Sequence, residues 1–122
     1  MKKYDYFVTG GAGFIGSHLC ELLLSRGKSV LVLDDLSTGN IANLNGCSDN
    51  SSFSFVRGSV LEKSLTTELV HQCGKVIHLA AAVGVEKIIR EPVETIETNV
   101  IGTENVLKAA ESFGTPVFIT ST

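Results

Sequence analysis

The sequence predicts an α/β fold with one doubly wound parallel sheet and helices on both of its faces. Short apolar runs alternate with stretches of helical periodicity along the 122 residues. The run within residues 29–34 is continuously apolar, which is typical of a parallel strand covered on both faces. Glycines are concentrated between the first apolar run and the first helical stretch, where such folds make a tight turn.

The first predicted unit is a strand, a glycine turn and a helix. Residues 4–9 are short, aromatic and β-branched, which predicts a buried strand. Residues 14–26 carry apolar side chains at helical spacing, and Gly27 supplies a C-terminal stop. Residues 29–34 hold a continuous apolar run, so they predict a second strand that is covered on both faces.

The middle of the chain is predicted to be less regular. Residues 36–52 are rich in Ser, Asn, Gly and Asp, so we expect a long loop with one short helical turn at residues 41–44. A third strand is expected over residues 52–56. It is followed by a helix over residues 61–73, which Gly74 is expected to end.

The last part of the chain completes the alternation of strands and helices. A fourth strand over residues 75–80 leads to a long helix, which Pro92 opens and which ends near Phe113, before Gly114. Residues 117–120 predict a fifth strand. Right-handed connections then give the strand order 3-2-1-4-5. Because no helix follows to cover the fifth strand, we expect the sheet to be C-terminally incomplete.

One stripe of the long helix is expected to face the core, because its mostly apolar side chains recur at helical spacing. Its members are Ile96, Val100, Thr103, Leu107 and Ala110. Gly102 lowers the helix propensity in the same segment, which predicts close approach by a neighbouring group. His78 lies in the apolar fourth strand, where we expect a hydrogen-bonded core residue and not a ligand or a catalyst.

The composition excludes several classes of protein. Apolar residues make up 43% and charged residues 19% of the chain, so we expect an ordered globular domain. The formal net charge of −3 is spread without basic blocks, which argues against binding nucleic acid. Because the sequence has neither a signal peptide nor a long apolar segment, we expect a cytoplasmic location and no membrane contact. Cys20, Cys47 and Cys73 form no CxxC pair, so we expect free thiols and no metal site.

The glycine turn has the arrangement of a dinucleotide-binding site. Gly10, Gly13 and Gly16 lie between a predicted strand and a predicted helix, where a diphosphate meets the helix N-terminus. We expect Gly10 to allow the tight turn, Gly13 to leave room for the phosphates, and Gly16 to let the helix pack closely on the sheet. A triphosphate-binding loop is excluded, because Ser17 and His18 stand where a Lys-Ser or Lys-Thr pair is required.

An acidic pair ends the second predicted strand. The carboxylate of Asp34 is placed to accept hydrogen bonds from the hydroxyls of an adenosine ribose. Asp34 and Asp35 would repel a ribose 2′-phosphate, and no Lys or Arg follows before Arg57. The sequence therefore predicts NAD in preference to NADP. The alternative to a nucleotide-binding site is a flexible turn that only caps a helix, and it gives the acidic pair no role.

The ordered motifs of the chain resemble those of one family. Residues 9–18, TGGAGFIGSH, are similar to the glycine signature of the extended short-chain dehydrogenases/reductases, with their GxxGxxG spacing. Further similar motifs are VLDDLSTGN at 32–40, VIHLAA at 76–81, TNVIGT at 98–103 and FITST at 118–122. That family includes the NAD-dependent nucleotide-sugar epimerases and dehydratases. The resemblance covers nearly all of the chain and implies a Rossmann fold with NAD as cofactor.

The resemblance also implies which residues contact the cofactor. They are Gly10, Gly13, Phe14, Ile15 and Gly16 at the diphosphate, Asp34 and Asp35 at the adenosine ribose, Ser37, Thr38 and Gly39 at the adenine side, Leu79, Ala80 and Ala81 at the ribose and nicotinamide half, and Asn99 on the long helix. Relatives often carry an aspartate after the glycine that ends the third strand. Here the pair is Gly58-Ser59, so we expect the adenine contact to be weakened or moved to Ser59 and Val60.

The catalytic residues of the family are expected only in part. Thr122 would stand at the family's catalytic Ser or Thr, which hydrogen-bonds the 4-hydroxyl or 4-keto oxygen of the sugar. The family's Tyr-x-x-x-Lys pair, whose tyrosine takes the hydroxyl proton while hydride leaves sugar C4 for NAD, follows this point. We therefore expect residues 1–122 to be an amino-terminal NAD-binding part without the catalytic pair or the substrate domain, and inactive alone.

The leading hypothesis is the NAD-binding portion of a nucleotide-sugar epimerase or dehydratase, similar to UDP-glucose 4-epimerase, that acts through transient hydride transfer at sugar C4. One alternative is a free-standing dinucleotide-binding or regulatory module without catalysis. Another is a family member that reduces a smaller carbonyl or oxidises a small alcohol. The expected partners are NAD and, in the parent protein, a nucleotide sugar. The resemblance also allows a homodimer, because relatives pair subunits through the long helix.

Overall fold

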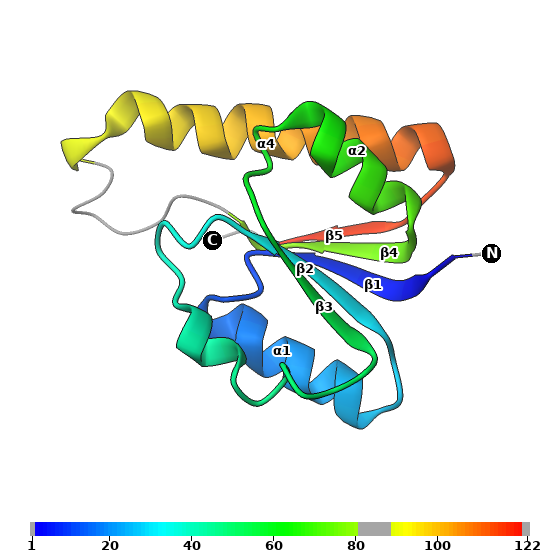
Figure 1. Cartoon of the computed structure of the whole chain (residues 1–122). Helices are drawn as coiled ribbons and strands as arrows, with labels where there is room; N and C mark the ends of the chain where they lie inside the picture. Colours follow the sequence, from blue (N-terminus) through cyan, green and yellow to red (C-terminus); the bar gives the residue numbers. More distant parts are fainter. Residues whose placement is uncertain (1, 81–88, 121–122) are drawn as a thin grey trace.

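The computed structural model describes residues 2–80 and 89–120, which form a five-stranded parallel sheet between layers of helices (Figure 1). In chain order the elements are β1 (Tyr4–Thr9), α1 (Phe14–Ser25), β2 (Val30–Asp34), the 3₁₀ helix η1 (Ile41–Leu44), β3 (Phe53–Arg57), α2 (Lys63–His71), β4 (Cys73–His78), α4 (Pro92–Phe113) and β5 (Val117–Ile119). The strand order is β3-β2-β1-β4-β5, and neighbouring strands are parallel. The predicted fold class and strand order are confirmed.

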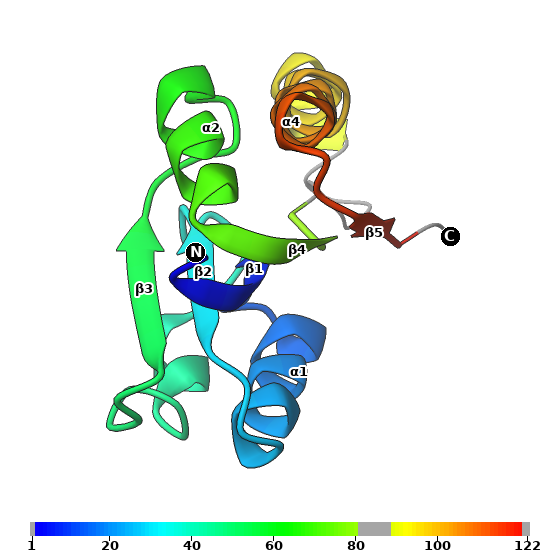
Figure 2. The same cartoon turned by 90° about the vertical axis from the view of Figure 1, so that its right-hand side faces the viewer.

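Helices cover both faces of the sheet. α2 and α4 lie on one face, and α1 lies on the other (Figure 2). Successive side chains of a strand point to opposite faces. Phe7 therefore joins an apolar cluster with Val76 and Val106 beneath α2 and α4, whereas Val8 joins a second cluster with Val32 against α1. We call these clusters the α2–α4 core and the α1 core.

The three cysteines are free thiols buried in these two cores. Cys20 and Cys47 belong to the α1 core, and Cys73 belongs to the α2–α4 core. Burial raises the pKa of Cys20 and of Cys73 to about 12 and also raises the pKa of Cys47, so all three stay protonated at neutral pH. Among residues 2–80 and 89–120, no group of His, Cys, Asp and Glu is arranged to hold a metal ion. No helix in the same ranges is long and apolar enough to cross a membrane.

The predicted elements are all found, but the end of the second helix (predicted at residue 73) and the start of the fourth strand (predicted at residue 75) each lie two residues earlier in the structure. Gly74 was expected to end the second helix, yet it lies inside β4, because the strand begins one residue earlier with Cys73 paired to β1. α2 ends at His71, where the backbone N–H of Gln72 donates back into the last turn of the helix. A strand can thus start directly after the helix, with no glycine needed between them.

The prediction that one stripe of α4 faces the core is wrong for the large side chains of that stripe. Ile96, Val100 and Leu107 are between 42% and 62% exposed. The buried face is instead built from Thr95, Gly102, Asn105, Val106, Ala109 and Ala110. Gly102 permits the close approach that was predicted there, because a Cβ at this position would lie 2.5 Å from Cγ2 of Val60. Small residues let α4 pack tightly, and its bulky stripe faces outward.

Candidate functional site

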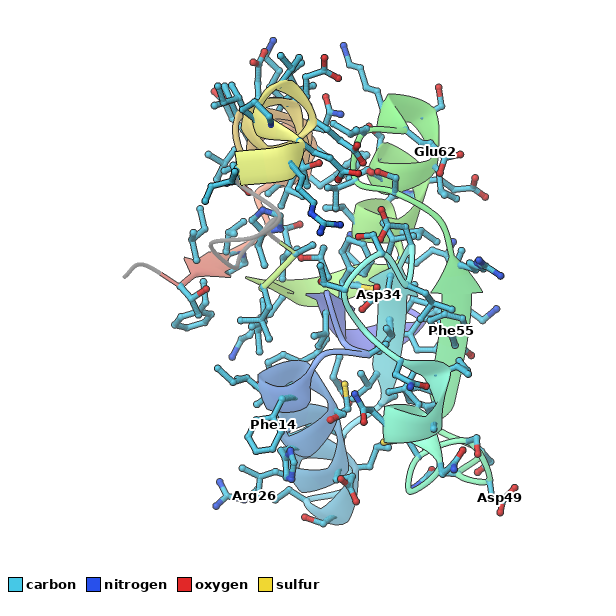
Figure 3. All side chains as sticks on the ribbon, turned by 90° about the vertical axis from the view of Figure 1, so that its left-hand side faces the viewer. Phe14, Arg26, Asp34, Asp49, Phe55 and Glu62 are labelled. Carbon is cyan, nitrogen blue, oxygen red and sulfur yellow. The ribbon has the colours of Figure 1, made fainter. Side chains whose placement is uncertain are left out.

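A cavity of about 880 Å³ opens at the carboxyl edge of the sheet, where α/β folds of this kind place their ligands. All five strands of the described sheet contribute to its wall at or near their ends. The contributions are Gly10 after β1, Asp34 in β2, Gly58 after β3, His78 in β4 and Ile119 in β5. Figure 3 views the molecule from the side of these strand ends and shows Asp34 near the centre, between Phe14 of α1 and Glu62 before α2.

The glycine turn after β1 is shaped by close backbone contacts. Gly10 has a φ of 74°, and a Cβ there would lie 2.8 Å from the backbone nitrogen of Ala80. A Cβ on Gly16 would collide with the carbonyl oxygen of Gly10. Gly13 differs, because a Cβ there would meet only that oxygen, at 3.4 Å. Its missing side chain therefore leaves space in the cavity and not in the protein interior.

The N-terminus of α1 lies at the cavity without a side-chain cap. Gly13 is the N-cap residue, and the first turn holds no acidic side chain. The first N–H groups of a helix have no carbonyl partner within it, and the helix dipole adds positive potential at this end. Phe14, Ile15 and Gly16, which carry three of these N–H groups, line the cavity. This arrangement fits an anion such as a diphosphate.

Asp34 is the buried acid at the end of β2. It is 8% exposed, and each carboxylate oxygen accepts a backbone hydrogen bond, Oδ2 from Ala12 N at 2.9 Å and Oδ1 from Leu36 N at 2.8 Å. Asp35 holds the following part of the loop in the same way, because its Oδ1 accepts from the backbone N–H of Ser37 at 2.9 Å. Because a carboxylate oxygen has more than one lone pair, Asp34 can hold the turn and still accept a hydrogen bond from a ligand hydroxyl.

The charged side chains in the described part of the cavity wall are all acidic. They are Asp34, Asp35 and Glu94. No lysine or arginine lines the wall within residues 2–80 and 89–120, so the N-terminus of α1 is its main source of positive potential. A phosphate next to Asp34 would be repelled, whereas a neutral hydroxyl would not.

His78 links the sheet to α4 at the other side of the cavity. Thr9 Oγ1 accepts from the backbone N–H groups of Leu79 and Ala80, each at 3.0 Å, which uses both of its lone pairs. The Thr9 hydroxyl therefore donates to Nδ1 of His78, 2.7 Å away. The proton of the ring is then on Nε2, which donates to Thr103 Oγ1 at 3.0 Å. Burial lowers the pKa of His78 to about 4, so the ring is neutral at pH 7. The predicted hydrogen-bonded core histidine is confirmed.

The cavity brings together the residues that the sequence analysis selected as cofactor contacts. All those that the structure describes lie in its wall, from Gly10 to Asn99. Ala81 and Thr122 lie outside the described residues. The geometry thus places the selected residues at one site, and their roles toward a ligand stay predictions.

Eight further residues of the wall were not among the predicted cofactor contacts. They are Leu33, Gly58, His78, Glu94, Thr98, Thr103, Ile119 and Thr120. His78 and Ile119 end the observed strands β4 and β5, and Thr120 follows β5. Thr120 is also the last residue of the predicted fifth strand, so its place at the carboxyl edge of the sheet made it a candidate from the sequence. Thr103 lies four residues after Asn99, on the same face of α4, and this spacing was also visible in the sequence.

Comparisons with known proteins agree with this geometry. The family model described as GDP-mannose 4,6 dehydratase matches residues 7–122. UDP-glucuronic acid decarboxylase 1 of Arabidopsis thaliana is 39% identical over 121 residues, which are 99% of this chain and 27% of that protein.

Two solved structures are similar over most of the chain. DesIV, a dTDP-glucose 4,6-dehydratase from Streptomyces venezuelae crystallised with NAD bound, superposes with a TM-score of 0.85 at 35% identity, over 91% of this chain and 37% of its own. The UDP-glucose 4-epimerase of Thermotoga maritima, solved with UDP-glucose, gives a TM-score of 0.86 at 35% identity, over 97% of this chain and 38% of its own. This chain thus spans well under half the length of these relatives. Because the family model matches nearly all of it, the chain belongs to the GDP-mannose 4,6 dehydratase family, within the NAD-dependent epimerases and dehydratases.

Proposed function

We propose that this chain binds NAD in the cavity, as the cofactor-binding part of a nucleotide-sugar epimerase or dehydratase. One observation carries the proposal. The uncapped N-terminus of α1 and the carboxylate of Asp34 lie in the wall of the same cavity, so they offer one ligand both an anion site and a hydroxyl acceptor. The NAD bound to DesIV supports the same assignment.

In this proposal the diphosphate and adenosine lie along the glycine turn and β2. The diphosphate accepts hydrogen bonds from N–H groups of residues 14–16, with Gly13 leaving the necessary space. Asp34 accepts from a hydroxyl of the adenosine ribose, and residues 37–39 cover the adenine side. NAD is preferred to NADP, because the described wall offers acidic side chains and no cation to a 2′-phosphate.

The nicotinamide half then lies toward β4, β5 and α4. Thr9 fixes the backbone N–H groups of Leu79 and Ala80 in this wall, and Asn99 lines it from α4. NAD, when bound, supplies a hydride acceptor for C4 of a sugar. We propose Thr122 as the group that hydrogen-bonds the 4-oxygen of that sugar, on the basis of the sequence resemblance alone.

We also propose that residues 1–122 are the amino-terminal NAD-binding part of a longer enzyme. Its Tyr-x-x-x-Lys pair and substrate domain would belong to the remainder, since this chain spans 27% of the Arabidopsis decarboxylase. A nucleotide sugar is the proposed substrate. A homodimer in the cytoplasm is the proposed context, for which the exposed stripe of α4 offers an apolar surface.

Calorimetric titration with NAD and NADP tests the proposed cofactor. We expect the protein to bind NAD more tightly than NADP and Asp34→Ala to weaken NAD binding by about 10- to 100-fold, the effect of losing hydrogen bonds to a charged group. Asp49→Ala is the control for removing an aspartate from the protein surface, because Asp49 is exposed and lies far from Asp34 (Figure 3). Equal affinity for both cofactors, or equal effects of the two substitutions, would refute the assignment.

The gene distinguishes the enzyme from a free-standing dinucleotide-binding or regulatory module. If the codons that follow Thr122 encode a Tyr-x-x-x-Lys pair, the protein has the catalytic groups that the proposal requires. If a natural stop codon follows instead, the polypeptide is a binding module. NAD binding is expected in both cases, so the titration and the gene sequence test separate parts of the proposal.

A further inference from the structure

The peptide groups on both sides of Ala12 are held by hydrogen bonds from outside the glycine turn. The N–H of Ala12 donates to Asp34 Oδ2 at 2.9 Å. Its carbonyl oxygen accepts two bonds from the loop after β2, one from the backbone N–H of Asn40 at 3.1 Å and one from Nδ2 of Asn43 at 2.8 Å. Ala12 itself is fully buried. The centre of the glycine turn is therefore fixed by side chains of Asp34 and Asn43.

The bond from Asn43 also fixes the loop that forms one wall of the cavity. Residues 37–39 line the cavity and belong to no helix or strand. At one end, Asp34 and Asp35 accept hydrogen bonds from the loop backbone. At the other end, Gly39 packs so closely on the turn that a Cβ there would lie 2.9 Å from the Ala12 carbonyl. Asn43 follows on η1, which lies beside the start of α1 (Figure 1), and it joins this end of the loop to the turn.

The direction of the Ala12 carbonyl matters for an anionic ligand. Because its oxygen accepts from Asn40 and Asn43, it faces the loop and not the N-terminus of α1. A carbonyl oxygen turned toward a diphosphate would repel it and oppose the helix N–H groups. Only the nitrogen of the Asn43 amide can donate to this carbonyl, so an asparagine and an aspartate are not equivalent here.

We propose that Asn43 is a positioning residue for the dinucleotide: its amide holds the Ala12 carbonyl away from the diphosphate and fixes the loop of residues 37–39 before the ligand arrives. The inference rests on the proposed function, because it assigns the cavity to NAD. Holding a loop in its binding conformation raises affinity, since less conformational freedom is lost on binding. Asn43 contributes in this way although it is exposed and is not among the residues that line the cavity.

The experiment compares Asn43→Ala and Asn43→Asp with the matched pair Asn45→Ala and Asn45→Asp in the full-length protein. Asn45 is an exposed asparagine at the end of the same 3₁₀ helix, and its side chain makes no hydrogen bond among the described residues. Three quantities are measured: NAD affinity by calorimetry, hydrogen exchange of residues 10–16 and 36–40 without NAD, and the free energy of unfolding in urea.

We expect Asn43→Ala to weaken NAD binding by about 3- to 10-fold, the effect of one hydrogen bond, and to raise exchange in both segments by a similar factor. Asn43→Asp should weaken binding more, because its carboxylate faces the Ala12 carbonyl and adds negative charge near the diphosphate. Both Asn45 variants should bind NAD as the unaltered protein does. Added NAD should restore slow exchange in the Asn43 variants.

Two results would overturn the inference. The first is unchanged NAD affinity in both Asn43 variants, and the second is a loss of affinity with no local change in exchange and a matching fall in the free energy of unfolding. The second result would make Asn43 a purely structural residue. If the unaltered protein does not bind NAD at all, the proposed function has failed, and that outcome is visible before any variant is made.

Discussion

β2 and β5 belong to the same sheet but have opposite surroundings. All five residues of β2 are buried, because β1 and β3 pair with its two edges and apolar clusters cover both faces. Within the described residues β5 pairs only with β4, and its Phe118 and Ile119 are 61% and 47% exposed. The cavity takes part of its wall from each strand. One side of the site therefore rests on a fully packed strand, and the other rests on an edge strand and α4.

The largest expected effect is at Gly10, where the two sides meet. Alanine there combines a left-handed backbone conformation with a clash against Ala80, so we expect a loss of roughly 2–5 kcal/mol in the free energy of unfolding. Gly27→Ala is the control, because Gly27 has a φ of 77° with open space around it and should lose only about 1–2 kcal/mol. Urea unfolding of both variants measures the difference. If both variants lost a similar free energy of unfolding, the close contact between the ends of β1 and β4 would not contribute to the cost of the Gly10 substitution.

Acid should weaken the junction at His78. Its pKa is about 4 in the folded protein against an ordinary value of 6.5, so the unfolded chain binds the proton more readily between these values. The neutral His78 ring therefore contributes fully to the free energy of unfolding above pH 6.5. This contribution is lost as the pH falls toward 4, by roughly 3 kcal/mol in total. Urea unfolding of the unaltered protein and of His78→Asn across this range measures it. If both proteins show the same pH dependence, the buried ring is not responsible.

Truncations in the two strands test the comparison directly. Val32→Ala in β2 removes two methyl groups from a fully buried site and should lower the free energy of unfolding by about 2 kcal/mol. Phe118→Ala removes a larger side chain from the exposed edge strand, yet the change should stay within about 0.5 kcal/mol. The same urea titration measures both. A larger loss for Phe118 would mean that β5 is covered in the folded protein, and the contrast between the strands would be wrong.

The contrast also explains which parts of the molecule could be predicted from the sequence. The continuous apolar run within residues 29–34 predicted β2, because a parallel strand covered on both faces carries apolar side chains at most positions. The glycine turn was equally clear, since few other residues fit at Gly10 or Gly16. These features depend on backbone geometry, which a short stretch of sequence encodes.

The rest depends on which surfaces meet, and a short stretch of sequence does not encode that. Residues recur at helical spacing on both faces of α4, so the spacing alone does not show which face is buried. The face with Gly102 packs inward because its small residues allow closer packing than Ile96 or Val100. The contact of Asn43 could not be predicted for a similar reason, because its hydrogen-bond partner Ala12 lies 31 positions earlier in the chain. Gly74 resembled a helix stop until strand pairing placed it in β4.

The buried thiols give each side of the sheet its own chemical reporter. An alkylating reagent reacts with thiolates, so it will modify Cys73 only when the α2–α4 core opens, and Cys20 and Cys47 only when the α1 core opens. Mass spectrometry of peptides labelled at increasing urea concentrations would then follow the two layers separately in the natural sequence, without a fluorophore or an engineered tag. Simultaneous labelling would identify a single cooperative unit, and staggered labelling would show which layer comes apart first.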